Sequence, residues 1–245
     1  MVKKMKEGYY RKTAVIVGVL FIIATLTALA SAAFLGTTLN GTDYILGVPD
    51  NENNVLVAVL FETILVVSII GYGVILFPIL KKQFEGLALA YVSILIVEAV
   101  LAIIGSICLL VMLTMGQDYA AGTLDVANSR IMGTILMALR EWSILFGSLI
   151  FFGVGSLILN YLLFLSGIVP RWLSIWGIIG NVCILSYGLM GIFGTATTDM
   201  MSASTLLAMP IAVQEMVFAS WLIIKGFNQP RAATMDRSEI SEVTG

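Results

Sequence analysis

The chain has no histidine among its 245 residues, so it lacks the commonest protein metal ligand and the usual general base near neutral pH. It has two cysteines, Cys108 and Cys183, both within apolar runs and without the spacing of a zinc or haem-attachment motif. The sequence therefore predicts no metal site and no cofactor. Both cysteines are expected to be small buried apolar residues.

Charged residues are scarce as well. They make up 11% of the chain, whereas soluble domains have about 25%, and the mean hydropathy is +1.02. The net charge is −2, and outside the first twelve residues the sequence offers no basic face, which excludes a nucleic-acid partner. These values predict a membrane protein whose surroundings are the lipid bilayer. They do not identify an oligomer or a partner subunit.

Long apolar runs are abundant, and a membrane-spanning helix needs about 20 mostly apolar residues. None of the runs alternates polar and apolar residues as a barrel strand would. We therefore predict an all-α fold, an integral membrane bundle of six transmembrane helices at 13–35, 54–80, 87–115, 131–165, 172–193 and 205–224. A basic N-terminus (1–12) precedes this transmembrane domain (13–227), and a polar tail (228–245) that we expect to be disordered follows it.

The distribution of Lys and Arg predicts the orientation, since cytoplasmic loops are enriched in both. Eleven of the thirteen basic residues lie in the N-terminus, in the loops after the second and fourth helices, or in the tail. The opposite loops, 36–53 and 194–204, have acidic residues but no Lys or Arg. The sequence thus predicts a multi-pass protein of the cell membrane with both termini cytoplasmic.

The first helix allows two interpretations. Its basic start, apolar run and the triplet Ala30-Ser31-Ala32 resemble a cleavable signal peptide. Its apolar run is longer than the roughly 7–15 residues usual for such a peptide, which favours a helix that is retained. Cleavage would leave five spans.

Charged residues within the predicted spans are the most unusual feature. Such residues cost roughly 2.5–3.5 kcal/mol each when they face lipid at the bilayer centre, so we expect them to point inward, meet one another and occupy one layer of the bundle. Asn181, which shares a helix face with Gly177 and Gly188, is the expected polar neighbour from the fifth span. The charged residues are one cation and four carboxylates: Arg140, Glu62, Glu98, Glu141 and Glu215.

Because one Arg cannot neutralise four carboxylates, we expect some of the glutamates to hold a proton or a cation. This predicts a protonatable site that binds or moves a small ligand or a proton, with the four Glu as acceptors and Arg140 as their organiser or as an anion clamp. A non-catalytic membrane subunit or assembly factor, whose polar layer only fixes helix packing, is the alternative. An intramembrane enzyme is the least supported reading, since no nucleophile–base pair stands at a recognisable spacing.

Several segments in this order resemble one family of prokaryotic membrane proteins. They include FPILKK (77–82), ALREWSILFG (138–147), VPRWLS (169–174) and WLIIKGF (221–227). Over residues 11–227 the chain is similar to the family catalogued as domain of unknown function 4386. The resemblance implies a multi-spanning membrane protein and implies no particular activity.

Overall fold

The computed structural model describes residues 2–36, 38, 48, 50–193 and 200–228. Within these residues the fold is all-α and has no strand, which confirms the predicted class. The predicted tail, residues 229–245, lies outside the described residues. The helices are α1 (Val2–Gly36), α3 (Glu52–Leu80), α4 (Glu85–Ala120), α5 (Val126–Ile144), the π-helix η1 (Leu145–Phe151), α6 (Phe152–Ser166), α7 (Arg171–Ile192) and α8 (Met200–Ile224).

Five helical segments in the described part are long and apolar enough to cross a bilayer, so the chain is a membrane protein. A sixth apolar stretch, Met209–Ile224 within α8, is shorter. The five longer segments are Tyr10–Gly36, Glu52–Leu80, Glu85–Ala120, Ser129–Ser166 and Arg171–Ile192.

The fourth of these segments is one continuous helix made of α5, η1 and α6. It is longer than a single span needs, as the sequence predicts. It ends at Gly167, which takes a left-handed conformation (φ +62°) and donates its N–H to the carbonyl of Leu163. A glycine in this conformation closes a helix without steric strain, and Pro170 then precedes the first residue of α7.

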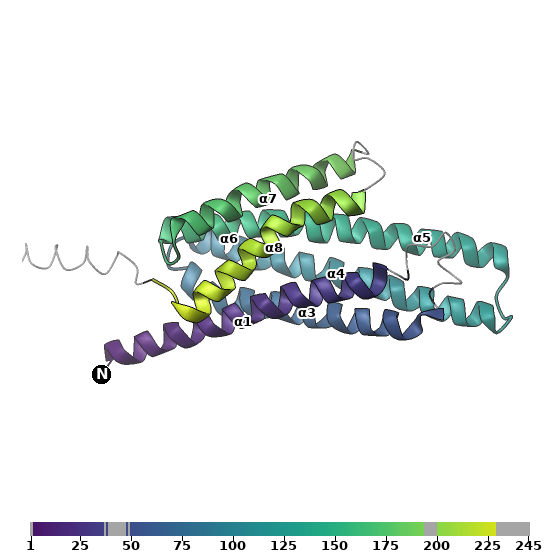
Figure 1. The fold of residues 1–245 in the computed structure, drawn as a ribbon, viewed down its shortest axis with the longest axis horizontal. Coiled ribbons are helices and arrows are strands. Elements are labelled where there is room, and N and C mark those ends of the chain that lie inside the picture. The colour runs from purple at the N-terminus through teal and green to yellow at the C-terminus, as the bar shows by residue number, and fades with distance from the viewer. Residues whose placement is uncertain (1, 37, 39–47, 49, 194–199, 229–245) are drawn as a thin grey trace, which may run out of the picture.

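The helices form a closed ring. Going round it, α1 packs against α3, α3 against α4, α4 against the α5–η1–α6 helix, α6 against α7, α7 against α8, and α8 back against α1 (Figure 1). Every helix thus has one face toward a common centre. Large apolar residues such as Phe21, Tyr72 and Phe218 fill part of that centre with stacked and edge-to-face rings.

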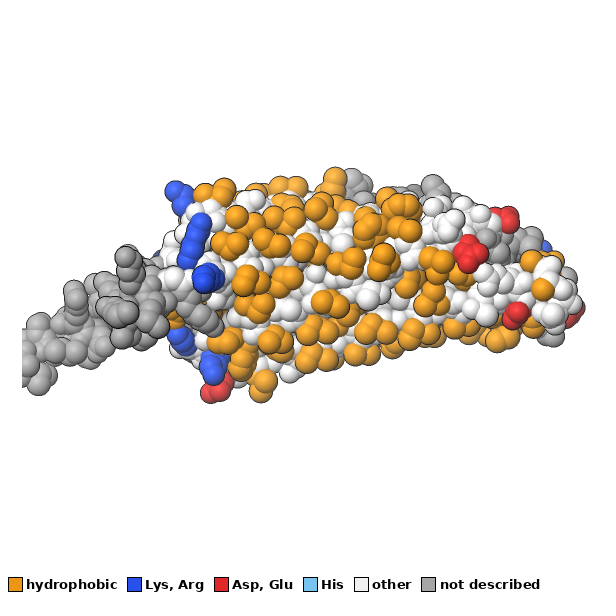
Figure 2. Space-filling model, turned by 90° about the horizontal axis from the view of Figure 1, so that it is seen from below, with side chains coloured by type: hydrophobic (Ala, Val, Ile, Leu, Met, Phe, Trp, Pro, Cys, Tyr) orange, Lys and Arg blue, Asp and Glu red, His pale blue; other side chains and the backbone are white. Residues whose placement is uncertain are grey.

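The face shown in Figure 2 carries a broad apolar band with Lys and Arg side chains gathered at one end. Contacts at that end tie the helix termini together. Arg11 donates to the carbonyl of Ile223 at 2.7 Å, Lys82 bonds the hydroxyl of Tyr10, and the backbone N–H of Asn228 reaches Ile168 at 2.8 Å.

Close approach between α1 and α8 depends on Gly18. A Cβ on residue 18 would lie 2.7 Å from the carbonyl oxygen of Ala219 and 2.8 Å from a side-chain carbon of Ile223. Backbone cannot move aside as a flexible side chain does, so Gly18 allows the two helices to touch. This is the small-residue contact typical of membrane helices.

We predict that Gly18→Ala lowers the free energy of unfolding in detergent by about 1–3 kcal/mol, the usual range for overpacking. The matched control is Gly86→Ala, because a Cβ there meets nothing within 4 Å. The control should be neutral or slightly stabilising, since Ala is the better helix former. Equal losses in the two variants, measured by reversible unfolding in mixed micelles, would contradict the packing described.

Candidate functional site

Arg140 forms an ion pair with one glutamate, Glu62. Its Nη2 lies 2.7 Å from Glu62 Oε1, and its Nη1 lies 3.5 Å from Oε2. The two side chains are only 5% and 13% exposed. Two parallel N–H···O contacts between a guanidinium and a carboxylate are among the stronger polar interactions in proteins, and here each group neutralises the other.

Two serines complete the environment of the pair. Ser31 of α1 donates to Glu62 Oε1 at 3.1 Å, and Ser106 of α4 donates to Oε2. The Arg140 side chain crosses α4 at Gly105, next to Ser106. A Cβ on residue 105 would lie only 3.3 Å from Nη1 of Arg140, so the glycine provides the space for this crossing. The cluster of Glu62, Arg140, Ser31 and Ser106 therefore links α1, α3, α4 and α5, and we call it the ion-pair cluster.

Glu141 does not join this cluster. Its side chain is exposed, and it forms no hydrogen bond or ion pair with any part of the chain that the structure describes. The expectation that all five charged residues point inward is therefore wrong for Glu141. Successive residues on a helix differ by about 100° in direction, so when Arg140 turns toward α4 its neighbour turns to the outside.

The remaining two glutamates, Glu98 and Glu215, line a cavity of about 320 Å³ at the centre of the helix ring. The expected single layer of charges is thus divided between two places. Glu98 and Ser106 are eight residues apart on α4, which corresponds to about 12 Å along the helix axis. The lining residues come from all the membrane helices and include Thr25, Leu29, Tyr72, Ser148, Phe152, Ile184 and Ile211.

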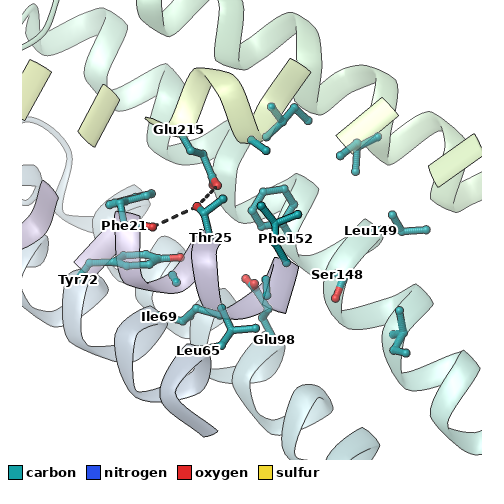
Figure 3. Close-up of a pocket in the computed structure, with 17 residues that line it drawn as sticks. Phe21, Thr25, Leu65, Ile69, Tyr72, Glu98, Ser148, Leu149, Phe152 and Glu215 are labelled. Carbon is teal, nitrogen blue, oxygen red and sulfur yellow. Dashed lines mark hydrogen bonds between the residues drawn. The ribbon is translucent and has the colours of Figure 1, made fainter. Parts of the chain in front are cut away.

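Glu98 is 6% exposed, and its Oε2 is buried without a hydrogen-bond partner among the described residues. Glu215 is half-buried and accepts a hydrogen bond from the Thr25 hydroxyl at 3.1 Å. In Figure 3 both carboxyl groups point into the space between the helices, one from α4 and the other from α8. Neither carboxylate has a cation within salt-bridge distance in the described part of the chain.

Aromatic rings form part of the cavity wall beside these carboxyls. Phe21 and Tyr72 stack with centroids 4.1 Å apart, and Phe152 lines the wall from the start of α6 (Figure 3). The rest of the lining is mainly aliphatic. The cavity is thus an apolar chamber with a small number of polar groups, which is the usual composition of a small-molecule site.

The π-helix lies at this cavity. η1 contributes Ser148 and Leu149 to the lining, and Phe152 follows it directly. π-helical turns are rare and are frequently found at functional sites, because the extra residue per turn changes where side chains point. On the neighbouring face, Gly147 packs against the backbone of Glu98 and the side chain of Leu101.

Asn181 is fully buried, donates to the Gly177 carbonyl at 2.7 Å and does not line the cavity. Its Oδ1 has no partner among the described residues, and the same holds for Oδ1 of Asn160. Asn160 of α6 packs directly on Gly177 of α7. Asn181 therefore bonds within its own helix, α7, at the glycine on which Asn160 packs. It forms no hydrogen bond with an acidic residue in the part of the chain that the structure describes, although the sequence predicts it as their neighbour.

The family described as Domain of unknown function (DUF4386) matches residues 16–226. The chain belongs to this family. Neither a curated protein nor a solved structure matches the chain. The family description names no activity, so the function of this DUF4386 domain has to be argued from the two sites above.

The structure adds site residues that sequence reasoning did not select: Thr25, Ser31, Tyr72 and Ser106. Hydroxyl residues are common in membrane helices and usually bond a carbonyl of their own helix. Thr25, Ser31 and Ser106 are distinctive because each bonds a glutamate of another helix. A signal existed at Ser31 and Ser106, since each is a polar residue within a long apolar run.

No group of three or more His, Cys, Asp or Glu residues that could hold a metal occurs in the described part of the DUF4386 domain. Cys108 is buried as expected, but Cys183 is exposed, so its expected burial is wrong. Because Cys183 lies in a membrane-spanning segment, its exposed thiol faces lipid. A small apolar side chain is as stable in contact with lipid as in the interior of the bundle.

We predict that Arg140→Gln lowers the free energy of unfolding by about 3–5 kcal/mol, because removing one partner of a buried ion pair leaves the other uncompensated. The adjacent Glu141→Gln is the matched control and should change the same quantity by less than about 0.5 kcal/mol, as exposed positions usually do. A loss at Glu141 equal to that at Arg140 would be incompatible with the ion-pair cluster.

Proposed function

We propose that this protein binds a small ligand within the membrane, in the central cavity, and that Glu98 and Glu215 are the polar groups that contact it. The observation that carries the proposal is that Glu98 lines an otherwise mostly apolar cavity and that its buried Oε2 has no hydrogen-bond partner among the described residues. The volume of about 320 Å³ lies within the range of roughly 300–1,000 Å³ that small-molecule sites occupy.

Energetic considerations support a ligand at Glu98. A buried polar atom without a hydrogen bond costs about 1–3 kcal/mol in proteins, and a buried, unpaired charge costs considerably more. Native structures rarely keep such a group unless it has a role. A proton, a cation or a hydrogen-bond donor delivered by a ligand would each satisfy the carboxyl, so binding is favourable at this position.

The ion-pair cluster supports a different role for Glu62. Its carboxylate accepts from Arg140, Ser31 and Ser106, which leaves it no need of a ligand. Such a cluster is what the alternative function, a membrane subunit or assembly factor, would require for helix packing. That alternative explains the cluster, but it assigns no purpose to a cavity with two carboxyls that have no cation partner among the described residues.

We further propose six membrane spans with both termini on the cytoplasmic side of the cell membrane. α8 has 25 residues, which corresponds to about 38 Å at 1.5 Å per residue and is enough to cross a hydrocarbon core of about 30 Å. The gathering of Lys and Arg at one end of the bundle (Figure 2) supports the orientation by the positive-inside rule.

The test is labelling with dicyclohexylcarbodiimide, a small apolar reagent that adds to carboxyl groups in their acid form. We predict that Glu98 is labelled at least about tenfold faster than Glu62 in membranes, because Glu98 lines the cavity, whereas the carboxylate of Glu62 is bound by Arg140, Ser31 and Ser106. Labelled positions are read by peptide mass spectrometry. Glu141→Gln serves as the background so that the exposed carboxyl does not contribute.

A cavity-filling variant, Ala212→Phe, provides the second control, since Ala212 lines the cavity. It should slow labelling of Glu98 and leave any labelling of Glu62 unchanged. If Glu62 reacts as fast as Glu98, or if Ala212→Phe leaves the reaction at Glu98 unaffected, the cavity is not an accessible site and the proposal fails.

A further inference from the structure

We infer that the ligand of the central cavity is a monocation with an apolar body, such as a quaternary or protonated amine bearing a hydrocarbon group. This inference rests on the proposed function and specifies its ligand class. Three properties of the cavity carry it: carboxyl groups without a cation partner among the described residues, aromatic walls and an opening toward the membrane.

The charged side chains of the cavity are all acidic. Glu98 and Glu215 line it, and among the described residues no Lys or Arg belongs to the lining. The one cation buried in the described part of the bundle, Arg140, is already bound to Glu62. An anionic ligand would therefore meet repulsion without compensation, whereas a cation would meet two carboxyl groups in surroundings of low dielectric constant, where attraction is strong.

The aromatic rings favour an organic cation over a bare metal ion. Phe152 lines the same cavity as the two carboxyls, beside the stacked rings of Phe21 and Tyr72. A ring face that is open to the cavity attracts an ammonium group within about 6 Å of the centroid. A small metal ion would need several oxygen ligands at short distance. The aliphatic remainder of the wall, including Leu65, Ile69 and Ile184, instead suits a hydrocarbon body.

An opening on the outside of the bundle indicates the route of entry. Two lining residues are also strongly exposed, Leu29 of α1 (52%) and Ile144 of α5 (45%). Both lie in helical segments that are long and apolar enough to cross a bilayer, so the opening faces hydrocarbon. A cation with an apolar body concentrates in the membrane and could enter sideways beside Leu29 and Ile144, which a hydrophilic ion could not do at this depth.

The experiment compares benzyltrimethylammonium with its neutral carbon isostere, neopentylbenzene. The two have nearly the same shape and differ in charge. Binding to the full-length protein in lipid nanodiscs is measured by calorimetry, and protein-free nanodiscs correct for partition into lipid. We expect the cation to bind at least tenfold more tightly than the isostere, and the anion phenylmethanesulfonate not to bind.

Three variants identify the groups responsible. Glu98→Gln and Glu215→Gln should each weaken binding of the cation about tenfold and leave the isostere unchanged. Phe152→Leu should weaken the cation more than the isostere, because only the cation interacts with the ring face. Glu141→Gln, which alters an exposed carboxyl outside the cavity, should change neither.

The outcomes separate this inference from the proposed function. If the cation and the isostere bind equally and Ala212→Phe abolishes both, the cavity binds small molecules but does not select cations, and only the inference is overturned. Preferential binding of the anion would also overturn it. If none of the probes binds, both the inference and the proposed function fail.

Discussion

The bidentate contact between Arg140 and Glu62 is the interaction on which the rest of the bundle depends. A guanidinium within a membrane span must be neutralised inside the protein, and Glu62 does so across α4, through the space left by Gly105. Because Ser31 and Ser106 bond the same carboxylate, the pair fixes four helices relative to one another. Its position therefore constrains how the remaining helices close the ring.

The pairing also decides which carboxyls remain uncompensated. With Arg140 committed to Glu62, Glu98 and Glu215 stand in the central cavity without a cation partner among the described residues. The two sites thus have different roles: the ion-pair cluster holds the helices together, and the central cavity is the proposed binding site. In the ion-pair cluster, the carboxylate of Glu62 accepts hydrogen bonds from three side chains. The cavity instead has aromatic walls, a π-helical turn at Ser148 and Leu149, and a carboxyl oxygen without a partner among the described residues.

Composition and hydropathy were sufficient to predict an all-α membrane bundle and the extra length of the fourth span. They could not decide which Glu binds Arg140, because that choice depends on how α3, α4 and α5 cross. Glu141 was predicted wrongly because the expectation that charges face inward does not determine how the helix is rotated. With Arg140 turned toward α4, the offset of about 100° between successive residues directs Glu141 to the outside. Ser31, placed in a possible cleavage triplet by sequence, packs into the ion-pair cluster in the structure.

The most direct test of this account is a pair of double-mutant cycles on the free energy of unfolding. One combines Arg140→Gln with Glu62→Gln, and the other combines Arg140→Gln with Glu98→Gln. We expect a coupling energy of about 1–3 kcal/mol in the first cycle and additivity within about 0.5 kcal/mol in the second. A coupling between Arg140 and Glu98 as large as that between Arg140 and Glu62 would show that Arg140 serves the cavity and would contradict the division into two sites.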